Sequence, residues 1–414
     1  MNLKLLLSST LIATSLVSSA QDANRTYAIT GDGNGDFMWM NIRQVDIGSG
    51  KITQDIFQRA KTNFVMMDAD TKQPVSANAG IAASYSPTAT MVAAAAYDKN
   101  HDKLFFTPMR IGELRWLDLN AKGDVQKYYT LRSSLLNSSE NVRDEAKNFT
   151  RMVIGADGNG YALTNDATRL IRFTTGKKVV ITDLGGLIDD ESNKTISVHN
   201  QCSSWGGDMI ADAYNKLYII SANHYVFSVD VETRVAKYIG YINGLPANYS
   251  TNGAAVDKDG AIVVSSANAF AGYYKFTLAD YNAKKIEGSD MVYNASDLAN
   301  GNLLLQKEAD AAKNFGSADF KAVVPVITNE AHIFPNPVTS NEFKISFNGQ
   351  AAGRYNVTIT DLSGKPVMNR VVNVAAKTQV ETIPLNRTFA KGVYMVKVTD
   401  ANNKFIFTER IVVQ

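Results

Sequence analysis

The chain of 414 residues carries 42 Lys and Arg against 40 Asp and Glu, and 45% of its residues are hydrophobic. This length exceeds one ordinary core, so we expect two or more domains, and the composition is typical of folded protein. The positive and negative charges balance and form no block of one sign. The chain therefore lacks the basic patch that is typical of a nucleic-acid-binding protein. The single cysteine, Cys202, excludes an internal disulfide.

The first twenty residues have the pattern of an export signal. Lys4 supplies a positive charge, residues 5–17 are largely apolar, and Ser18-Ser19-Ala20 are the small residues that a signal peptidase accepts. We therefore expect residues 1–20 to be a signal peptide and the mature chain to begin at Gln21. No later run reaches the roughly 18 apolar residues that span a bilayer.

Residues 21–305 read as a repeated all-β region. A strand, a tight turn opened by Asp or Asn, and a second strand recur, and each of the clearer copies is followed by a further strand. The copies begin near Tyr97, Ala156, Ala211, Val256 and, more faintly, Ala299. Repeated antiparallel units of three or four strands predict the blades of a β-propeller.

Two runs of small residues indicate which strands are innermost. Val92–Ala96 and Gly253–Val256 each precede an Asp turn, and strands that crowd around a central axis need small side chains. Six blades fit best if Leu303–Leu305 pairs with the N-terminal strands, and five or seven also fit. The Asp-x-Asp-Gly turns resemble those of NHL-like and quinoprotein-like propellers, a resemblance that concerns the fold and implies no activity.

The motifs of common enzymes are missing from the sequence. It contains no His-Glu-x-x-His, Cys-x-x-Cys, Gly-x-Ser-x-Gly or phosphate loop, so we predict no catalytic residue. The stretch from His199 to Asp208 is unusually polar and precedes an innermost strand, which would place it at the mouth of the central channel. The candidate ligand-binding residues there are Arg151, His199, Trp205, Asp208 and Asn252. A hydrated channel without a ligand is the alternative, and Cys202 beside His199 lacks the third partner of a nucleophilic site.

One glycine-rich turn has the spacing of a calcium loop. Asp32, Asn34 and Asp36 place oxygen side chains at positions i, i+2 and i+4. Phe37 stands where such a loop has Gly, and Arg43 where it has its closing Glu. A plain hairpin turn is therefore the alternative, so no cofactor is predicted and calcium remains open.

The last part of the chain changes character. Residues 306–332 lose the repeat and are expected to be a linker. Residues 333–414 contain about seven alternating strands, with Phe343, Ile345 and Phe347 pointing inward, and predict a small immunoglobulin-like β-sandwich.

Short motifs in this module are specific. They are Phe334-Pro335-Asn336-Pro337, the turn with Asp361, Gly364 and Lys365, and the late pair Gly392 and Tyr394. With these motifs the module resembles the type A C-terminal sorting domain of the type IX (Por) secretion system of Bacteroidetes. The resemblance implies periplasmic transit, recognition by the translocon, cleavage by a sortase-like protease, and release or attachment to surface lipopolysaccharide.

These features together predict a secreted or cell-surface propeller that binds or adheres to a glycan, protein or small molecule. The alternative is a propeller hydrolase, lyase or dehydrogenase with a calcium- or cofactor-dependent site at the channel mouth. Propeller enzymes assemble their sites from distant blades, so the missing motifs leave this alternative open.

Overall fold

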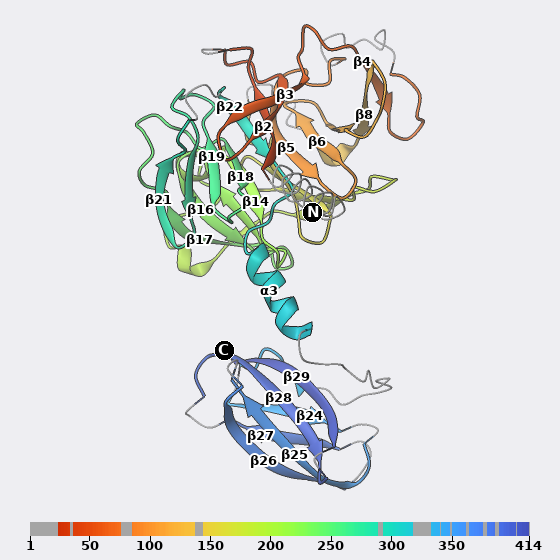
Figure 1. The fold of residues 1–414 in the computed structure, drawn as a ribbon, viewed down its shortest axis with the longest axis vertical. Coiled ribbons are helices and arrows are strands. Elements are labelled where there is room, and N and C mark those ends of the chain that lie inside the picture. Colours follow the sequence, from red (N-terminus) through yellow and green to blue (C-terminus); the bar gives the residue numbers. More distant parts are fainter. Residues whose placement is uncertain are drawn as a thin grey trace, which may run out of the picture. The chain divides into compact units, whose positions relative to one another are not determined.

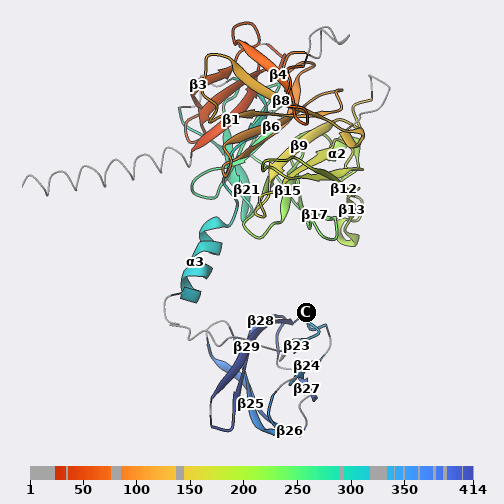
Figure 2. The ribbon, with the colours of Figure 1, turned by 90° about the vertical axis from the view of Figure 1, so that its right-hand side faces the viewer.

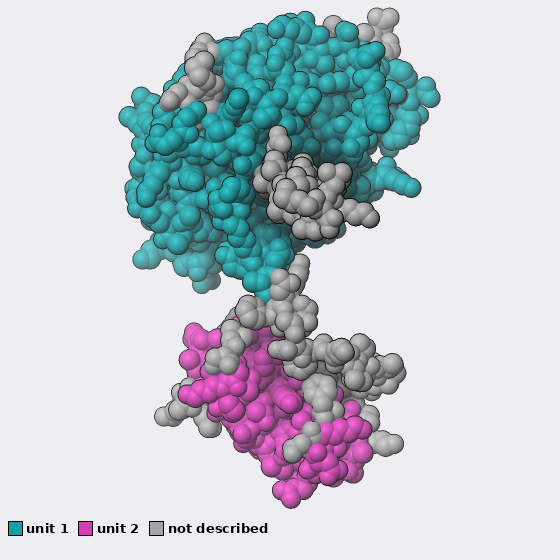
Figure 3. All heavy atoms as spheres, in the orientation of Figure 1, with its two compact units in different colours: residues 1–318 teal, residues 319–414 magenta. Residues whose placement is uncertain are grey.

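The computed structural model describes residues 24–33, 36–75, 85–136, 144–288, 293–317, 333–339, 341–347, 350–361, 364–375, 379–385, 389–402 and 404–413. The chain divides into two compact units, residues 1–318 and 319–414, and each is described by itself (Figure 3). The expected signal peptide lies outside the described residues. None of the helices in the described ranges is long and apolar enough to cross a membrane.

The first unit is a β-propeller whose described strands form five sheets (Figure 1). From the axis outward, blade 1 contains β22 (Ala295–Ala299), β1 (Arg25–Thr30), β2 (Asn41–Asp46) and β3 (Lys51–Phe57). Blade 2 contains β5 (Val92–Asp98), β6 (Lys103–Pro108), β7 (Glu113–Asp118), β8 (Gln126–Arg132) and a parallel outer strand, β4 (Phe64–Asp68). Blade 3 contains β9 (Phe149–Ile154), β10 (Gly160–Thr164), β11 (Leu170–Phe173) and β12 (Ile181–Gly185).

The remaining two blades follow the same plan. Blade 4 contains β14 (Asp208–Ala211), β15 (Leu217–Ile220), β16 (Tyr225–Val229), β17 (Val235–Tyr241) and the short parallel strand β13 (Ile188–Asp189). Blade 5 contains β18 (Gly253–Val256), β19 (Ile262–Ser265), β20 (Tyr274–Thr277) and β21 (Asp280–Lys285). Short helices lie in the loops: η2 (Ser134–Leu136), η3 (Glu191–Asn193) and α2 (Gln201–Ser204).

The ring closes within blade 1, where the last propeller strand pairs with the first. β22 runs antiparallel to β1, with Leu298 opposite Ala28. The innermost strands β22, β5, β9, β14 and β18 then follow one another around the axis. The predicted propeller is confirmed, and its described blades number five, one of the alternatives, instead of the six that the spacing favoured.

The reason for the difference is the Leu303–Leu305 segment, which does not close the ring. Leu304 instead bridges in parallel to Asp212 at the end of β14. Its amide donates to the Ala211 carbonyl at 3.0 Å, and its carbonyl accepts from the Ala213 amide at 2.9 Å. Leu304 is buried there, so its apolar side chain gains more by covering the base of blade 4 than by extending blade 1.

Small side chains predominate in the innermost strands β5 and β18, as the sequence predicts, whereas β9 and β14 carry larger residues such as Met152 and Met209. Ala95, Ala96, Ala254 and Ala255 are all buried. Bulky residues lie on later strands and fill the spaces between blades, as Phe105 does against Phe173 of the next blade, with ring centroids 5.2 Å apart. Apolar packing between blades therefore supplies most of the core.

Asp turns join the first and second strands of the blades on one face, which we call the bottom face. Asp257 is typical: its Oδ1 accepts from the amides of Asp259 and Ala261, each at 2.9 Å. The segment 300–305 crosses this face after β22. The Nδ2 atoms of Asn300 and Asn302 both donate to the Val256 carbonyl at 2.8 Å, which ties the segment to blade 5. The opposite face, where the chain precedes the innermost strands, is called the top face.

Helix α3 (Gln306–Ser317) occupies the first part of the expected linker. Its first turns are rich in Ala, Lys and Glu, which are strong helix formers, so a helix forms where the composition alone indicated a linker. Ala309 is buried, and Lys307 lies 3.3 Å from the Asp259 carboxylate on the bottom face. The remainder of the expected linker, residues 318–332, lies outside the described residues.

The second unit is a β-sandwich of seven described strands (Figure 2). One sheet contains β23 (Ile333–Phe334), β24 (Glu342–Ser346) and β27 (Val380–Pro384). The other contains β26 (Pro366–Val374), β25 (Gly353–Thr360), β28 (Gly392–Asp400) and β29 (Phe405–Val413). Phe343, Ile345 and Phe347 are fully buried in its core, which confirms their predicted orientation.

The close approach of β18 and β22 gives a test of the axial packing. A Cβ atom at Gly253 would lie 2.8 Å from the backbone carbon of Asp297 and 2.8 Å from the amide nitrogen of Leu298. We expect Gly253→Ala to destabilise the protein by about 1–3 kcal/mol because backbone cannot yield as a flexible side chain can. In thermal unfolding, the melting temperature should fall by several degrees.

Gly176→Ala is the matched control, because a Cβ at this position meets no atom within 4 Å. It should change the stability by less than about 0.5 kcal/mol. Equal melting temperatures for the two variants would contradict the tight axial packing.

Candidate functional site

Arg151 on β9 is the fully buried centre of the predicted channel-mouth cluster. Its Nε and Nη2 atoms donate to the Gly206 carbonyl at 3.0 and 2.9 Å, Nη1 donates to the Thr164 carbonyl at 3.2 Å, and Nη2 also donates to the Ser204 carbonyl. Burial lowers the pKa of Arg151, whereas the charges of Asp208 and Asp166 oppose this shift. The guanidinium thus joins blade 3 to the loop that leads into blade 4, and these contacts use four of its five N–H donors.

His199 and Trp205 lie in that same loop. The His199 Nδ1 is 2.7 Å from the Asp166 carbonyl and its Nε2 is 3.2 Å from the Leu187 carbonyl. Trp205 donates from Nε1 to the His199 carbonyl at 3.0 Å. Cys202 is free and exposed, and both imidazole nitrogens of His199 face carbonyl oxygens instead of its thiol.

Asn252 forms its hydrogen bonds in a different part of the structure. Its Oδ1 accepts from the Ser250 hydroxyl and from the Ala267 amide, the latter at 3.0 Å, within the loops of blade 5. The structure therefore brings Arg151, His199 and Trp205 together around one loop, followed directly by Asp208, while Asn252 orders the neighbouring blade.

Asp208 ties three innermost strands together at the axis. Its Oδ1 accepts from the Met209 amide at 2.7 Å, and its Oδ2 accepts from the Ala254 amide of β18 at 2.7 Å and the Leu298 amide of β22 at 3.5 Å. The residue is completely buried. Burial raises the pKa of Asp208, although these amides favour the ionised form.

A second buried carboxyl, Asp297 on β22, lies beside it. Burial raises the pKa of Asp297 well above its usual range, and the charge of Asp208 raises it further. Within the described residues, neither oxygen of Asp297 accepts a hydrogen bond of good geometry from an amide, hydroxyl or cationic group; its side-chain partner is the Asp208 carboxyl, and the Ala95 amide lies close enough to oppose the pKa shift. Two adjacent carboxyls in an apolar interior cannot both ionise cheaply, so we infer that the pair retains a proton at neutral pH.

Asp297 is not among the residues that the sequence predicted for the site. The available signal was an acid inside Ala295–Ala299, a run of otherwise small or apolar residues with one serine. An acid in such a run either has a partner or remains neutral.

Little space remains along the axis itself. The cavity between the innermost strands measures about 10 Å³ and is lined by residues such as Ala95, Met152, Met209, Ala254 and Leu298. That volume accommodates roughly one water molecule. The two ends are covered by the chain's own groups: Asp208 and the Arg151 loop on the top face, and residues 300–305 on the bottom face.

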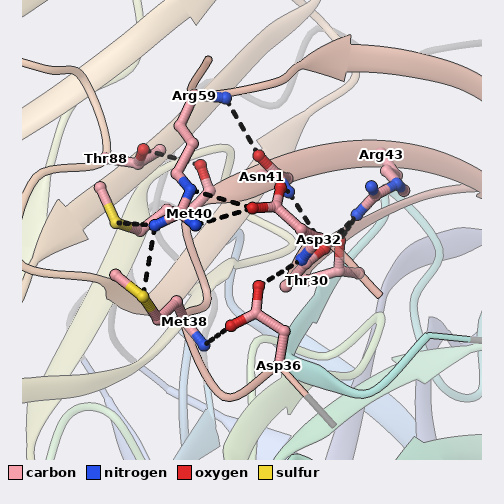
Figure 4. A network of polar contacts seen from close by, with 10 residues as sticks. Thr30, Asp32, Asp36, Met38, Met40, Asn41, Arg43, Arg59 and Thr88 are labelled. Atoms are coloured by element: carbon pink, nitrogen blue, oxygen red, sulfur yellow. Dashed lines mark hydrogen bonds and ion pairs between the residues drawn. The ribbon is translucent and has the colours of Figure 1, made fainter. Parts of the chain in front are cut away.

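The calcium candidates form a compact polar network on the top face of blade 1 (Figure 4). The Asp32 carboxylate accepts from Asn41 Nδ2 at 2.6 Å and pairs with Arg59 at 2.7 Å, and the Asn41 hydrogen bond is the largest cause that lowers the pKa of Asp32. Asp36 accepts from the amides of Asp32 and Met38 at 2.7 and 3.1 Å. Asn34 lies outside the described residues.

Arg59 therefore supplies positive charge where a bound cation would sit in a calcium loop. Arg43, at the position of a closing Glu, pairs with Asp55 at 3.0 Å instead. In the described ranges, no group of three or more His, Cys, Asp or Glu side chains is arranged to hold a metal ion.

The predicted motif residues of the sandwich lie at its turns and edges. Asn336 donates to the Arg410 carbonyl at 2.7 Å and accepts from the Val412 amide at 3.0 Å, so the exposed turn 334–337 is fastened to β29. Asp361 accepts from the Lys365 amide at 3.1 Å across a turn in which Gly364 has φ +82°. Tyr394, two residues after Gly392, is buried and donates its hydroxyl to the Ala390 carbonyl at 2.8 Å. These residues thus define the turns that the motifs predict.

The described strands define a β-propeller of five blades with an accessory β-sandwich. Residues 332–414, which contain the sandwich, match the family described as "Secretion system C-terminal sorting domain". The second unit is therefore a sorting domain, and the protein is exported by the type IX secretion system to the cell surface or the medium. A search of curated proteins found no matching sequence.

Solved structures with similar folds include propellers of several kinds. PorZ of Porphyromonas gingivalis, described as an essential bacterial surface component of the type IX secretion system, shares 14% identity with a TM-score of 0.30, and the match covers 94% of this chain and 51% of PorZ. This chain thus spans about half the length of PorZ. Virginiamycin B lyase of Staphylococcus aureus shares 12% identity over 90% of this chain and 92% of the lyase, with a TM-score of 0.32. At these values neither match carries an argument about activity.

The axial carboxyl pair predicts how stability depends on pH. The folded state keeps a proton that the unfolded chain releases above the usual Asp value of 3.8, so the free energy of unfolding should fall as the pH rises from about 4 through neutrality. Asp297→Asn removes one of the two carboxyls and should flatten this dependence between pH 5 and pH 8. At pH 8 its melting temperature should exceed that of the parent by about 2–4 °C for each kcal/mol gained.

Asp124→Asn is the control, because Asp124 is an exposed carboxyl. It should leave the pH profile of the melting temperature unchanged. The same slope in the parent and in Asp297→Asn would contradict a shared axial proton.

Proposed function

We propose that the propeller is a binding protein that the sorting domain delivers to the outside of the cell. The observation that supports this most directly is the use made of the channel-mouth residues. Arg151 and Asp208 are completely buried, and their hydrogen bonds join neighbouring blades. These residues make a rigid scaffold, and rigid scaffolds typically present ligand sites on their surface.

Open clefts at the perimeter of the blades favour the same proposal. One, of about 250 Å³, lies between blades 1 and 2 and is lined by Arg25, Gln44, Gln54, Asp102 and Gln126, among others. Another, of about 300 Å³, lies between blades 2 and 3. Both approach the size of small-molecule sites, while the axial cavity holds roughly one water molecule.

The propeller-enzyme alternative requires reactive groups that a substrate can reach at the channel mouth. Arg151, His199 and Asp208 face backbone groups of other loops and strands, which favours binding over catalysis at this place. Glycan, protein and small-molecule ligands all remain within the proposal.

Export depends on the second unit. We expect a chain that lacks residues 333–414 to accumulate in the periplasm, because the groups that the secretion system recognises are then absent. Immunoblots of periplasm, cell surface and medium, with the full chain expressed from the same promoter as the control, measure this. Release of the truncated chain at the level of the full chain would contradict delivery by the sorting domain.

Binding without conversion is tested on the purified full chain. In a thermal-shift screen of glycans and small metabolites, we expect at least one compound class to raise the melting temperature and to be recovered chemically unchanged by mass spectrometry. A ligand at about 100 times its Kd contributes about 2.7 kcal/mol, or roughly 5–10 °C.

Calcium and a chelator form a second arm of the screen. Neither should shift the melting temperature if the turn of Asp32 and Asp36 is held by Arg59. A calcium-dependent rise of similar size, or conversion of the ligand, would favour the enzyme alternative.

A further inference from the structure

The cleft of about 300 Å³ between blades 2 and 3 joins an apolar floor to a cationic rim. Trp116, Leu131 and Val179 form the floor, and Lys72, Lys177 and Lys178 stand at the rim. Lys72 comes from the turn after β4 in blade 2, whereas Lys177 and Lys178 come from the β11–β12 loop of blade 3. Two blades therefore bring their ammonium groups to one cleft.

A stack of aromatic rings supports the floor. Phe105 lies 5.6 Å from Trp116, and Trp116 stacks on Tyr129 with centroids 5.5 Å apart and planes 15° from parallel. The Lys72 Nζ lies 5.4 Å from the centroid of Tyr129, at the end of this stack. The position of this charge is thus set by a cation–π contact.

The loop that carries the other two lysines is braced from both sides. Lys103 donates from Nζ to the carbonyls of Thr175 and Gly176 at 2.9 and 2.8 Å, which anchors the loop to blade 2. The Thr174 hydroxyl donates to the Lys178 carbonyl at 2.9 Å and accepts from the Val180 amide at the same distance. The backbone beneath Lys177 and Lys178 is therefore ordered before any ligand arrives.

The turn beneath Lys72 is ordered as well. The Lys72 amide donates to the Asp68 carbonyl at 3.0 Å, and the Asp68 carboxylate accepts from the amides of Asp70 and Thr71 at 3.1 and 2.8 Å. Lys72 itself has φ 60°, the left-handed conformation. Among non-glycine residues, Asn adopts this conformation most readily, which guides the choice of substitution.

The three ammonium groups are not neutralised by the protein. In the described ranges, none of them lies within 4.0 Å of a carboxylate, in contrast to Arg132 at the end of β8, which pairs with Glu113 at 2.8 Å. Asp70 is the acidic residue in the lining, and it too forms no ion pair in these ranges. The cleft therefore carries a local charge of about +2, although the whole chain is nearly neutral.

We propose that this cleft binds a small organic oxyanion, namely a phosphate or sulfate ester whose organic part lies on the apolar floor. Three lysines from two braced turns supply point charges for a tetrahedral oxyanion. The floor of Trp116, Leu131 and Val179 supplies the surface that an ester has over the inorganic ion. The inference rests on the proposed binding function and names the ligand class and its site.

The test compares phenyl phosphate, phenyl sulfate, inorganic phosphate and benzyl alcohol on the purified full chain by calorimetric titration. We expect both esters to bind more tightly than inorganic phosphate, with an affinity that falls as salt is added, and benzyl alcohol not to bind. The order of the two esters distinguishes a phosphate site from a sulfate site.

The decisive variant combines Lys72→Asn, Lys177→Gln and Lys178→Gln, and should weaken ester binding at least tenfold. The matched control combines Lys194→Asn, Lys51→Gln and Lys61→Gln. These lysines are exposed and lie outside the cleft, and Lys194, like Lys72, has a positive φ (57°), so both sets remove three positive charges and replace one lysine at positive φ. The control should bind the esters as the parent does. If the triple variant is unstable, the single variant Lys178→Gln should still weaken binding at least twofold.

Failure of this inference differs from failure of the proposed function. Equal binding by the triple variant and the control, or no binding of either ester, overturns the cleft, while a ligand found in the screen would still support a binding protein. Specific binding followed by release of phenol supports the cleft and overturns the proposal that the propeller only binds.

Discussion

The structure depends on one constraint, the convergence of five innermost strands on a single axis. Close approach favours small side chains there, such as Ala95 and Ala254, and any buried polar group must find a partner. Asp208 meets both conditions because one carboxylate accepts amides from three strands that the chain reaches at widely separated positions. Asp297 lies beside it and Arg151 joins blade 3 to the loop of blade 4, so buried charged groups help to hold the blades in register.

This constraint has a consequence for function. Groups that close the axis are not available to a ligand, so the polar residues that look most like a site in the sequence are the ones most committed to the fold. A ligand would therefore have to bind at the surface. Clefts form there at the blade boundaries because adjacent sheets diverge toward the perimeter. The lysine-rimmed cleft forms at such a boundary. Lys103 of blade 2 donates hydrogen bonds to a loop of blade 3. The next two residues of that loop, Lys177 and Lys178, have no acidic partner in the described ranges.

Delivery and recognition are separate in this chain. The sorting domain has its own core of residues such as Phe343, Ile345 and Val396. Its motif residues act locally: Asn336 fastens a turn to β29, and Gly364 permits a left-handed position between two strands. Because these roles are local, the motif can be recognised in the sequence of any cargo.

Local sequence patterns specify those features of this protein that depend on a few neighbouring residues. They predicted an all-β propeller, the small innermost strands Val92–Ala96 and Gly253–Val256, and a sandwich recognised by its turn motifs, because alternation, side-chain size and turn residues act over a few positions. Only the tertiary structure decided the number of blades, since Leu304 and Ala295–Ala299 are both apolar enough to form a last strand and their burial against distant residues chose between them.

The same reason explains the site. Asp32 has the spacing of a calcium ligand, yet Arg59, 27 residues away, occupies its carboxylate. Asp297 lies beside Asp208, about 90 positions away in the sequence, and Lys72 lines the same cleft as Lys177, about 105 positions away. Electrostatic interactions between residues so far apart in the sequence depend on the closed ring of blades. The tertiary structure is therefore needed to show which charges are paired, which share a proton, and which remain free to bind.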